Sequence, residues 1–209
     1  MIKLNILVLG ATGRVGSRIV SYALNDGHHV IAFVRTPSKL HISDKNLQVM
    51  QGNVLNKEDI ESAIAAGDVV ISALNTDGTT TLSESLPLIL QAMQKVKLKR
   101  IITVGTAGIL QSRLTPSVLR YQSSESKRKS TTAAQEHHNV YKLLAQSNMD
   151  WTIVCPTYLP DGPYMGNYRV ERDFLPEGGT EISVADTAHF AYKQIQSTEY
   201  VKARVGIAY

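Results

Sequence analysis

Short apolar runs alternate with amphipathic stretches along most of the chain. Nearly continuous apolar runs that end in turn residues favour strands buried on both faces, whereas apolar residues at helical spacing favour helices that cover them. The predicted strands are residues 6–9, 29–34, 47–51, 68–73, 100–104, 151–154 and 204–208. The predicted helices are residues 17–24, 56–66, 82–97, 132–147 and 186–196.

This alternation of strands and helices predicts an α/β fold with a Rossmann-like, doubly wound parallel sheet and helices on both faces. The 209 residues suffice for one such domain and are too few for a full second one, so we expect residues 1–209 to form a single domain. Ligands of such sheets bind beyond the carboxyl ends of the strands. The loops that follow the strands are therefore expected to share one cleft.

A glycine turn lies between the first predicted strand and the first predicted helix. Gly10 can adopt a backbone conformation closed to other residues, Gly13 lets the main chain approach a ligand, and Gly16 lets helix and strand pack closely. Unpaired N–H groups and the dipole at the helix N-terminus favour an anion there. The turn therefore predicts the pyrophosphate site of a dinucleotide. Its further predicted contacts are Thr12, Arg14 and Val15.

An arginine, Arg35, follows the predicted strand 29–34. NAD-preferring proteins commonly place a carboxylate here, which binds the ribose 2′-hydroxyl. A guanidinium instead suits a 2′-phosphate and stacks on adenine. We therefore expect NADP(H) as the cofactor, the competing interpretation being that Arg35 is a solvated turn residue.

Two further loops carry candidate cofactor contacts. Asn53 and Val54 follow the strand 47–51, where an adenine contact is expected. Ala73, Leu74 and Asn75 lie at the end of the strand 68–73, where small residues would let the backbone pass close to the central riboses. For Ala73 and Leu74 the other interpretation is that they complete the core.

Several of these segments together resemble the atypical short-chain dehydrogenase/reductases related to biliverdin reductase B, also called flavin reductase. The similarity covers nearly the whole chain, and its segments are residues 10–16, 34–35, 52–55, 151–156, 161–163 and 182–186. The resemblance implies NADPH-dependent hydride transfer to a planar acceptor such as a flavin, a quinone or a tetrapyrrole, with little acid–base machinery. It also implies that Thr106, Pro156 and Thr157 lie against the nicotinamide.

Two residues are candidates for catalysis. Thr106 can donate a hydrogen bond to an acceptor, or it can simply satisfy the backbone of its own turn. Tyr158 stands where the resembled reductase has a histidine; a phenol donates a hydrogen bond but titrates far from neutrality, which disfavours proton delivery to a tetrapyrrole. A Tyr-x-x-x-Lys pair is missing, because Tyr141 is followed by Leu144 and Ala145. Alcohol dehydrogenation is therefore disfavoured.

Another class of function is compatible with the same residues. A non-catalytic NADP(H)-binding redox sensor of the NmrA-like kind, which signals to a protein partner, also needs no Tyr-x-x-x-Lys pair. The segment 111–130 contains many serine and basic residues and is predicted to be a mobile lid, or else a disordered loop without function. Within it, Arg113 and Arg120 are candidates to meet an anionic substrate.

Composition narrows the remaining possibilities. The net charge of +4 is mild and its basic residues are dispersed, so no nucleic-acid partner is expected. No apolar run approaches the roughly 20 residues of a membrane span, and we expect a cytoplasmic protein, monomeric or weakly dimeric. The single Cys155 offers no disulfide or metal cluster, and the adjacent His137 and His138 point too far apart on a helix to share one ion, so no metal is expected.

Overall fold

The computed structural model describes residues 2–76, 78–126 and 128–209. Within them the chain forms an eight-stranded sheet in the order β3-β2-β1-β4-β5-β6-β8-β7. Neighbouring strands run parallel except β7, which is antiparallel to β8. The strands are β1 Asn5–Leu9, β2 His29–Val34, β3 Leu47–Gln51, β4 Val69–Ser72, β5 Arg100–Val104, β6 Asp150–Pro156, β7 Arg169–Arg172 and β8 Ala203–Ala208.

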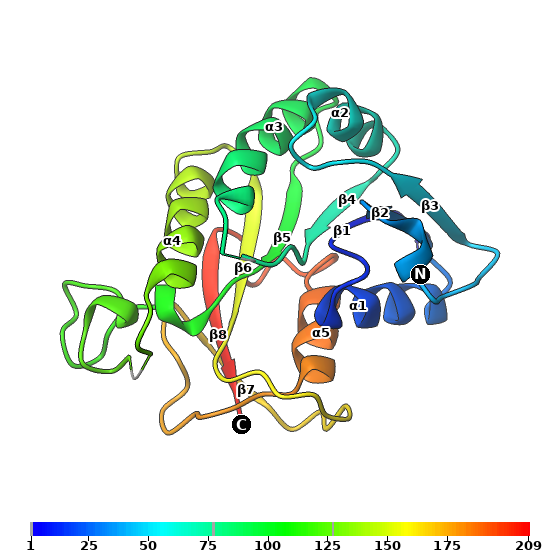
Figure 1. Ribbon diagram of the computed structural model, residues 1–209. Helices are drawn as coiled ribbons and strands as arrows, with labels where there is room; N and C mark the ends of the chain where they lie inside the picture. Colours follow the sequence, from blue (N-terminus) through cyan, green and yellow to red (C-terminus); the bar gives the residue numbers. More distant parts are fainter. Residues whose placement is uncertain (1, 77, 127) are drawn as a thin grey trace.

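Helices cover both faces of this sheet (Figure 1). They are α1 Arg14–Asn25, α2 Lys57–Ala65, α3 Thr81–Lys95, α4 Thr132–Ala145 and α5 Val184–Lys193. Helices α1 and α5 pack together on one face, and α2, α3 and α4 follow one another across the other. None of the helices in the described part of the chain is long and apolar enough to cross a membrane. The predicted Rossmann-like α/β fold is confirmed.

The core has two layers, one on each side of the sheet. Successive side chains of a strand point to opposite faces, so a strand that is apolar at every position feeds both layers. In β1, Leu7 and Leu9 join the layer under α2, α3 and α4, whereas Ile6 and Val8 join the layer under α1 and α5. The continuous apolar runs in the sequence are thus explained by burial on both faces.

Some element boundaries differ from the sequence-based prediction, and the caps explain two of them. Helix α1 begins at Arg14 rather than at residue 17, because Gly13 is already its N-cap. Helix α5 begins at Val184 rather than at residue 186, because the Ser183 side chain caps it by accepting a hydrogen bond from the Asp186 backbone. The antiparallel edge strand β7 was not expected, so the sheet is mixed rather than entirely parallel.

Candidate functional site

The turn after β1 lies at the point where the strand order reverses, between β1 and β4. Gly10 has a φ of 79°, and a Cβ atom there would lie 2.6 Å from the Ala73 carbonyl oxygen in the loop after β4. A Cβ atom on Gly16 would lie 2.2 Å from the Gly10 carbonyl oxygen. Both positions therefore exclude any side chain, and the predicted site residues Gly10 and Ala73 are brought into direct contact.

The first turn of α1 presents its backbone N–H groups at this place. Its N-cap, Gly13, donates a hydrogen bond to the Gly10 carbonyl oxygen at 3.0 Å. Among the described residues, no side chain caps the helix. Thr12 and Arg14 are exposed, whereas the Val15 side chain is buried in the core, so Val15 can offer a ligand only its backbone. The arrangement suits an anion such as a pyrophosphate.

Arg14 connects the glycine turn to the loop that follows β6. Its Nη1 donates hydrogen bonds to the Leu159 carbonyl oxygen at 3.1 Å and to Asp161 Oδ1 at 3.2 Å. Both charged side chains are largely exposed, so this ion pair is weak. The predicted cofactor contact Arg14 therefore has a protein partner, Asp161, whose pairing the sequence did not indicate.

Arg35 lies at the carboxyl end of β2, beside the glycine turn. It follows Phe33 by two residues, and Phe33 pairs with Leu9 of β1. The side chain is exposed, and the described residues provide no hydrogen-bond or ion-pair partner for its guanidinium. The guanidinium is therefore free to meet a ligand at the turn.

The loop after β3 is held by its own side chains. Asn53 Oδ1 accepts a hydrogen bond from the Leu55 backbone at 3.1 Å, and the Asn53 backbone donates to Asp59 Oδ2 at 2.8 Å. The Asn53 side chain therefore has its amide N–H groups left for a ligand. Val54 is buried in the core and can contribute only its backbone.

The loop after β4 extends the sheet before it leaves the core. The Ala73 backbone N–H donates to the Leu9 carbonyl oxygen at 2.9 Å, and both Ala73 and Leu74 are half-buried. Asn75 is exposed, and its Oδ1 accepts a hydrogen bond from the Thr76 backbone at 2.9 Å. Ala73 and Leu74 thus take part in the core and also border the glycine turn.

Thr106 lies just beyond β5, next to the end of β6. The Gly105 backbone N–H donates to the Val154 carbonyl oxygen at 2.7 Å, which joins the two strand ends. Thr106 is the N-cap of the short helical turn η2, Ala107–Ile109, and its Oγ1 accepts a hydrogen bond from the Gly108 backbone at 3.3 Å. The hydroxyl hydrogen is not used by this bond, so Thr106 can still act as a donor.

The residues at the end of β6 lie at the same carboxyl end of the sheet as Thr106. Pro156 is buried and pairs with Ile207 of β8. The Thr157 hydroxyl donates to the Thr180 carbonyl oxygen at 3.3 Å, and Tyr158, which is 61% exposed, forms a bridge with Glu181. Tyr158 therefore lies at the solvent-exposed border of the candidate site, whereas Pro156 and Thr157 are less exposed.

The two adjacent histidines of α4 have different surroundings. Tyr121 Oη lies 2.9 Å from His138 Nδ1, so His138 belongs to a local polar contact. Burial lowers the pKa of His137 to about 4, although the charge of Glu136 opposes this. Neither histidine is a freely exposed surface residue. Among the described residues, no group of three His, Cys, Asp or Glu side chains is arranged to hold a metal ion.

One important carboxylate was not predicted as part of the site. Asp186 is completely buried and accepts hydrogen bonds from the Gly166 backbone at 2.9 Å and from Tyr209 Oη at 2.6 Å. Further hydrogen bonds from Met165 and Ser183 complete its shell. Asp186 thereby fixes the segment that follows Asp161. The Ser-x-x-Asp spacing at the start of α5, a capping pattern, was the available signal.

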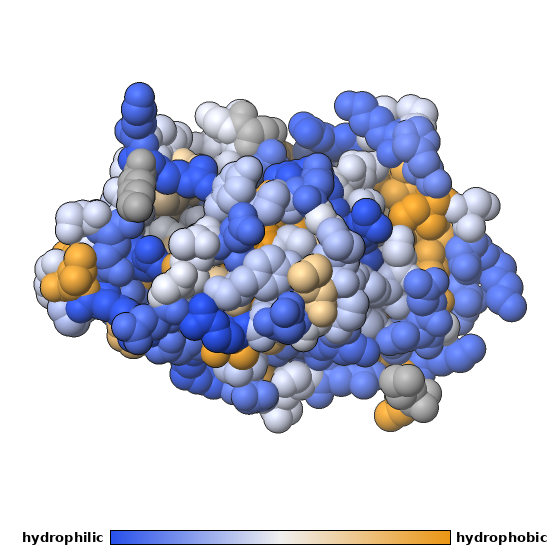
Figure 2. Space-filling view, turned by 90° about the horizontal axis from the view of Figure 1, so that it is seen from below, coloured by the Kyte–Doolittle hydropathy of each residue, from blue (hydrophilic) through white to orange (hydrophobic). Residues whose placement is uncertain are grey.

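Seen from the side on which β8 ends, the molecule is mostly hydrophilic, with separate apolar patches (Figure 2). The predicted site residues come from six loops, one after each of the strands β1 to β6, and these loops lie together at the carboxyl ends of the parallel strands. A dinucleotide binds in this position in sheets of this kind. The fold and the position of these loops together define a Rossmann-like dinucleotide-binding protein.

Comparison with known proteins specifies the class further. The sequence profile of the protein family described as NAD(P)H-binding matches residues 10–198. The chain belongs to this NAD(P)H-binding family, and its similarities agree with the atypical short-chain dehydrogenase/reductases. Its relatives include reductases, so the coarse assignment is an NAD(P)H-binding, reductase-like protein.

Individual relatives cover different shares of their own length. The chain is 26% identical to the uncharacterized protein YwnB of Bacillus subtilis, over 94% of each chain. It is 30% identical to the photosystem II assembly factor Ycf39 of Synechocystis over 92% of this chain, but it spans only 59% of that protein.

Two solved structures are similar over almost their entire length. A protein of Bacteroides thetaiotaomicron, provisionally described as an epimerase, is 28% identical with a TM-score of 0.86, covering 100% of this chain and 98% of that one. A protein of Streptococcus pneumoniae, provisionally described as an NADH-flavin reductase, is 25% identical with a TM-score of 0.83, covering 98% and 99% of the two chains.

Proposed function

We propose that this protein is an NADPH-dependent reductase that transfers a hydride to a planar acceptor such as a flavin, a quinone or a tetrapyrrole. The observation that carries the proposal is the N-terminus of α1, which no side chain of the described residues caps, behind a turn in which Gly10 and Gly16 exclude side chains. Membership of the NAD(P)H-binding family and the flavin-reductase description of the Streptococcus pneumoniae protein support it.

The residues present fit a dinucleotide. The first-turn amides of α1 and the exposed Thr12 and Gly13 would hold the pyrophosphate. Ala73, Leu74 and Asn75 would border the riboses, and Asn53 would donate its amide hydrogens to the adenine. Val15 and Val54 would contribute backbone groups because their side chains are buried.

Arg35 favours NADPH over NADH in this proposal. Its guanidinium has no protein partner among the described residues and lies one strand away from the glycine turn. A free guanidinium pairs well with a 2′-phosphate, and its charge contributes most where it forms two parallel hydrogen bonds.

The acceptor end would be formed by Thr106, Pro156, Thr157 and Tyr158. When bound, NADPH supplies the hydride. Thr106 would donate its free hydroxyl hydrogen to the acceptor, and the exposed Tyr158 ring would flank it. Positioning of the reactants would then account for most of the rate enhancement.

Tyr141 does not provide the acid–base group of alcohol dehydrogenases. Its ring packs edge-on against Trp151, with ring centres 6.0 Å apart, and the Arg204 guanidinium lies 4.4 Å from its centre. Tyr141 is thus part of the packing beneath α4. A reductase that depends on positioning is therefore favoured over an alcohol dehydrogenase.

The proposal is tested by measuring binding and turnover separately. Purified protein is titrated with NADPH and with NADH while cofactor fluorescence is followed. NADPH oxidation is then measured with flavin mononucleotide, menadione and dichlorophenolindophenol. We expect tighter NADPH binding and turnover with at least one acceptor. Binding without turnover would replace the reductase by a non-catalytic redox sensor of the NmrA-like kind, and absence of binding would overturn both.

A further inference from the structure

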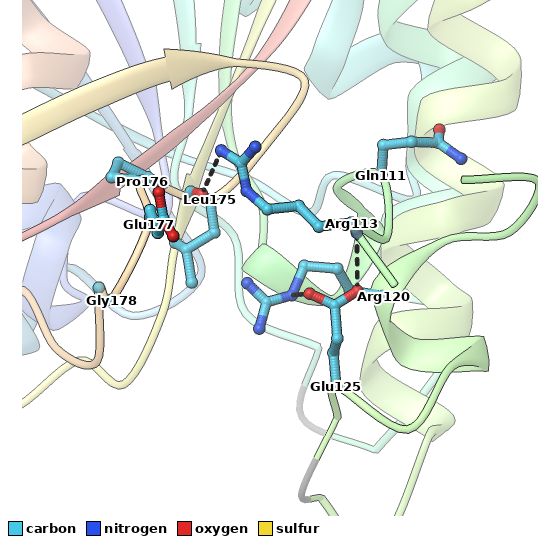
Figure 3. A pocket seen from close by; sticks show the side chains of 9 residues that line it. Gln111, Arg113, Arg120, Glu125, Leu175, Pro176, Glu177 and Gly178 are labelled. Atoms are coloured by element: carbon cyan, nitrogen blue, oxygen red, sulfur yellow. Dashed lines mark hydrogen bonds and ion pairs between the residues drawn. The ribbon is translucent and has the colours of Figure 1, made fainter. Parts of the chain in front are cut away.

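A pocket of about 140 Å³ lies between the segment after η2 and the segment after β7 (Figure 3). One wall comes from the loop after β5 and carries two arginines and a glutamate. The other wall comes from the segment that connects β7 to α5. The lining residues are Gln111, Arg113, Arg120, Glu125, Leu175, Pro176, Glu177, Gly178 and Gly179.

Arg120 is the residue whose bonding is incomplete. Its side chain is only 19% exposed, and its partner in the described chain is Glu125, with Nε and Oε1 3.9 Å apart. This distance is too long for a hydrogen bond, so the N–H donors of the guanidinium have no protein acceptor among the described residues. Figure 3 shows the guanidinium pointing across the pocket towards the segment with Gly178. Because these donors face the pocket and have no protein acceptor among the described residues, they are available to a ligand.

Glu125 is already satisfied by other groups. Burial alone would raise the pKa of Glu125, but hydrogen bonds from Ser112 and from the Leu114 backbone, together with the charge of Arg120, hold it below its usual range. The Arg113 backbone also donates to Glu125 Oε2 at 2.9 Å. Glu125 is therefore a fixed carboxylate with little capacity left for Arg120.

The charged side chains around Arg120 are of both signs, and of the two arginines that line the pocket Arg120 is the one whose guanidinium donates no hydrogen bond to the described part of the chain. Arg113 approaches the same pocket, and its guanidinium donates to the Leu175 carbonyl oxygen at 3.1 Å and pairs with Glu171. Burial lowers the pKa of Arg120, Glu125 opposes this and Arg113 adds to it. The guanidinium of Arg120 thus faces one cation and one anion. Glu177, the other lining carboxylate, is exposed at the rim.

The pocket adjoins the end of the sheet at which the acceptor is proposed to bind. Gly179 precedes Thr180, whose carbonyl oxygen accepts the hydrogen bond from Thr157. A Cβ atom on Gly179 would lie 2.5 Å from Ala208, the residue after Ile207, which pairs with Pro156. The pocket is therefore about one strand away from Pro156 and Thr157, which are predicted to lie against the nicotinamide.

We propose that this pocket binds a carboxylate group carried by the acceptor, and that Arg120 is the residue that selects it. The assignment to the acceptor rests on the proposed reductase function. The planar guanidinium presents parallel N–H donors that match a carboxylate, and the partly enclosed position strengthens the interaction.

The test uses benzoate as a carboxylate probe and benzamide as its neutral counterpart. Each is titrated by calorimetry into the full chain without cofactor. We expect benzoate to bind more tightly than benzamide. In Arg120→Met, benzoate affinity falls about tenfold, as expected for loss of a charge-assisted hydrogen bond. Arg120→Lys, which keeps the charge but not the fork, gives an intermediate loss and covers the case in which Arg120→Met unfolds.

Arg128→Met is the matched control, because Arg128 is exposed in the same loop and does not line the pocket. It should leave benzoate affinity at the wild-type value. Equal affinity for benzoate and benzamide, or equal loss in the Arg128 and Arg120 variants, would overturn the carboxylate site. Neither measurement involves NADPH, so failure of the reductase proposal would be seen separately, in the cofactor titration. Where turnover is present, benzoate must compete with the acceptor; non-competitive behaviour would overturn the acceptor assignment.

Discussion

Arg35 is the residue that determines cofactor preference in the proposed function. It lies beside the glycine turn with a guanidinium that has no partner in the described chain. Arg35→Asp should weaken NADPH binding by about 2 kcal/mol, or about thirtyfold, because a charge-assisted contact with the 2′-phosphate is lost. NADH affinity should be spared. Fluorescence titration with both cofactors measures the two effects.

The matched control is Lys45→Asp, which makes the same change of charge on an exposed residue before β3, at the amino ends of the strands rather than at their carboxyl ends. It should leave both affinities near the wild-type values. If Arg35→Asp weakened the binding of NADPH and of NADH equally, Arg35 would not contact the 2′-phosphate. The proposed preference for NADPH would then not be explained by Arg35.

Thr106 has a structural role in its turn and a proposed role in hydride transfer. Thr106→Val removes the hydroxyl while keeping the shape, so turnover should fall with little change in NADPH affinity. Because Oγ1 also accepts a hydrogen bond from the Gly108 backbone, the variant should lose about 1 kcal/mol of stability. Steady-state kinetics, cofactor titration and thermal unfolding separate these effects. Thr106→Ser should keep turnover, and wild-type turnover in Thr106→Val would leave Thr106 a turn residue.

At the scale of elements, the contact between β1 and α1 depends on Gly16. An exposed helical glycine replaced by alanine usually gains stability by roughly 1 kcal/mol. Here the added Cβ would lie 2.2 Å from the Gly10 carbonyl oxygen, so the clash outweighs the helix propensity. Gly16→Ala should therefore lower the free energy of unfolding by about 1–3 kcal/mol and weaken NADPH binding. Chemical denaturation and cofactor titration measure these changes.

Arg18→Ala supplies the comparison for Gly16→Ala. Arg18 lies in the same helix and is exposed, so its replacement changes helix propensity without a clash. It should leave stability within about 0.5 kcal/mol of wild type. A Gly16→Ala variant as stable as Arg18→Ala would show that α1 can shift away from β1 without cost.

The elements with strong local signals were predicted from the sequence, and those set by distant contacts were not. Strands such as β1 and β6 are apolar at nearly every position because both faces are buried. The strand β7 has four residues, two of them arginines, and exists because it pairs with β8 at the edge of the sheet. Such pairing has no periodic signature within four residues, so β7 could not be predicted.

The same distinction holds for the candidate site. The position of Gly10 and Gly16 in the fold could be predicted because backbone requirements act locally. The hydrogen bonds of Asp186 to the segment 165–166, and the ion pair of Arg14 with Asp161, join residues that are distant in the sequence. Side chains that act by tertiary contact leave no local sequence pattern, so these hydrogen bonds and this ion pair were found only in the structure.

At the scale of the whole molecule, the candidate site depends on both halves of the chain. Arg14 of the first helix reaches Leu159 and Asp161 beyond β6, and Asp186 at the start of α5 holds the segment that follows. The Arg204 guanidinium of β8 donates to the Ile109 carbonyl oxygen at 2.6 Å, close to Thr106. The proposed acceptor and cofactor ends of the site should therefore lose their geometry together when the sheet unfolds.

Stability of the whole molecule should fall as the solution is acidified, because burial lowers the pKa of several histidines. His137 titrates in the folded protein with a pKa of about 4, and burial also lowers the pKa of His28, His138 and His189. An unfolded histidine titrates near pH 6.5. Between about pH 6.5 and pH 4 the unfolded chain therefore binds protons that the folded chain does not, and the free energy of unfolding decreases.

Urea denaturation at several pH values between about 7 and 4 measures this decrease in the free energy of unfolding, and a variant of His137 measures the part due to that residue. His137 alone should account for on the order of 1–2 kcal/mol between pH 7 and pH 5. His137→Gln should flatten the decline by that amount. Carboxyl groups with lowered pKa, such as Asp186 and Asp26, act in the same direction only below about pH 4.5, so they do not obscure the histidine range. A decline of the same steepness in His137→Gln would show that the imidazole of His137 is protonated in the folded protein as readily as in the unfolded chain.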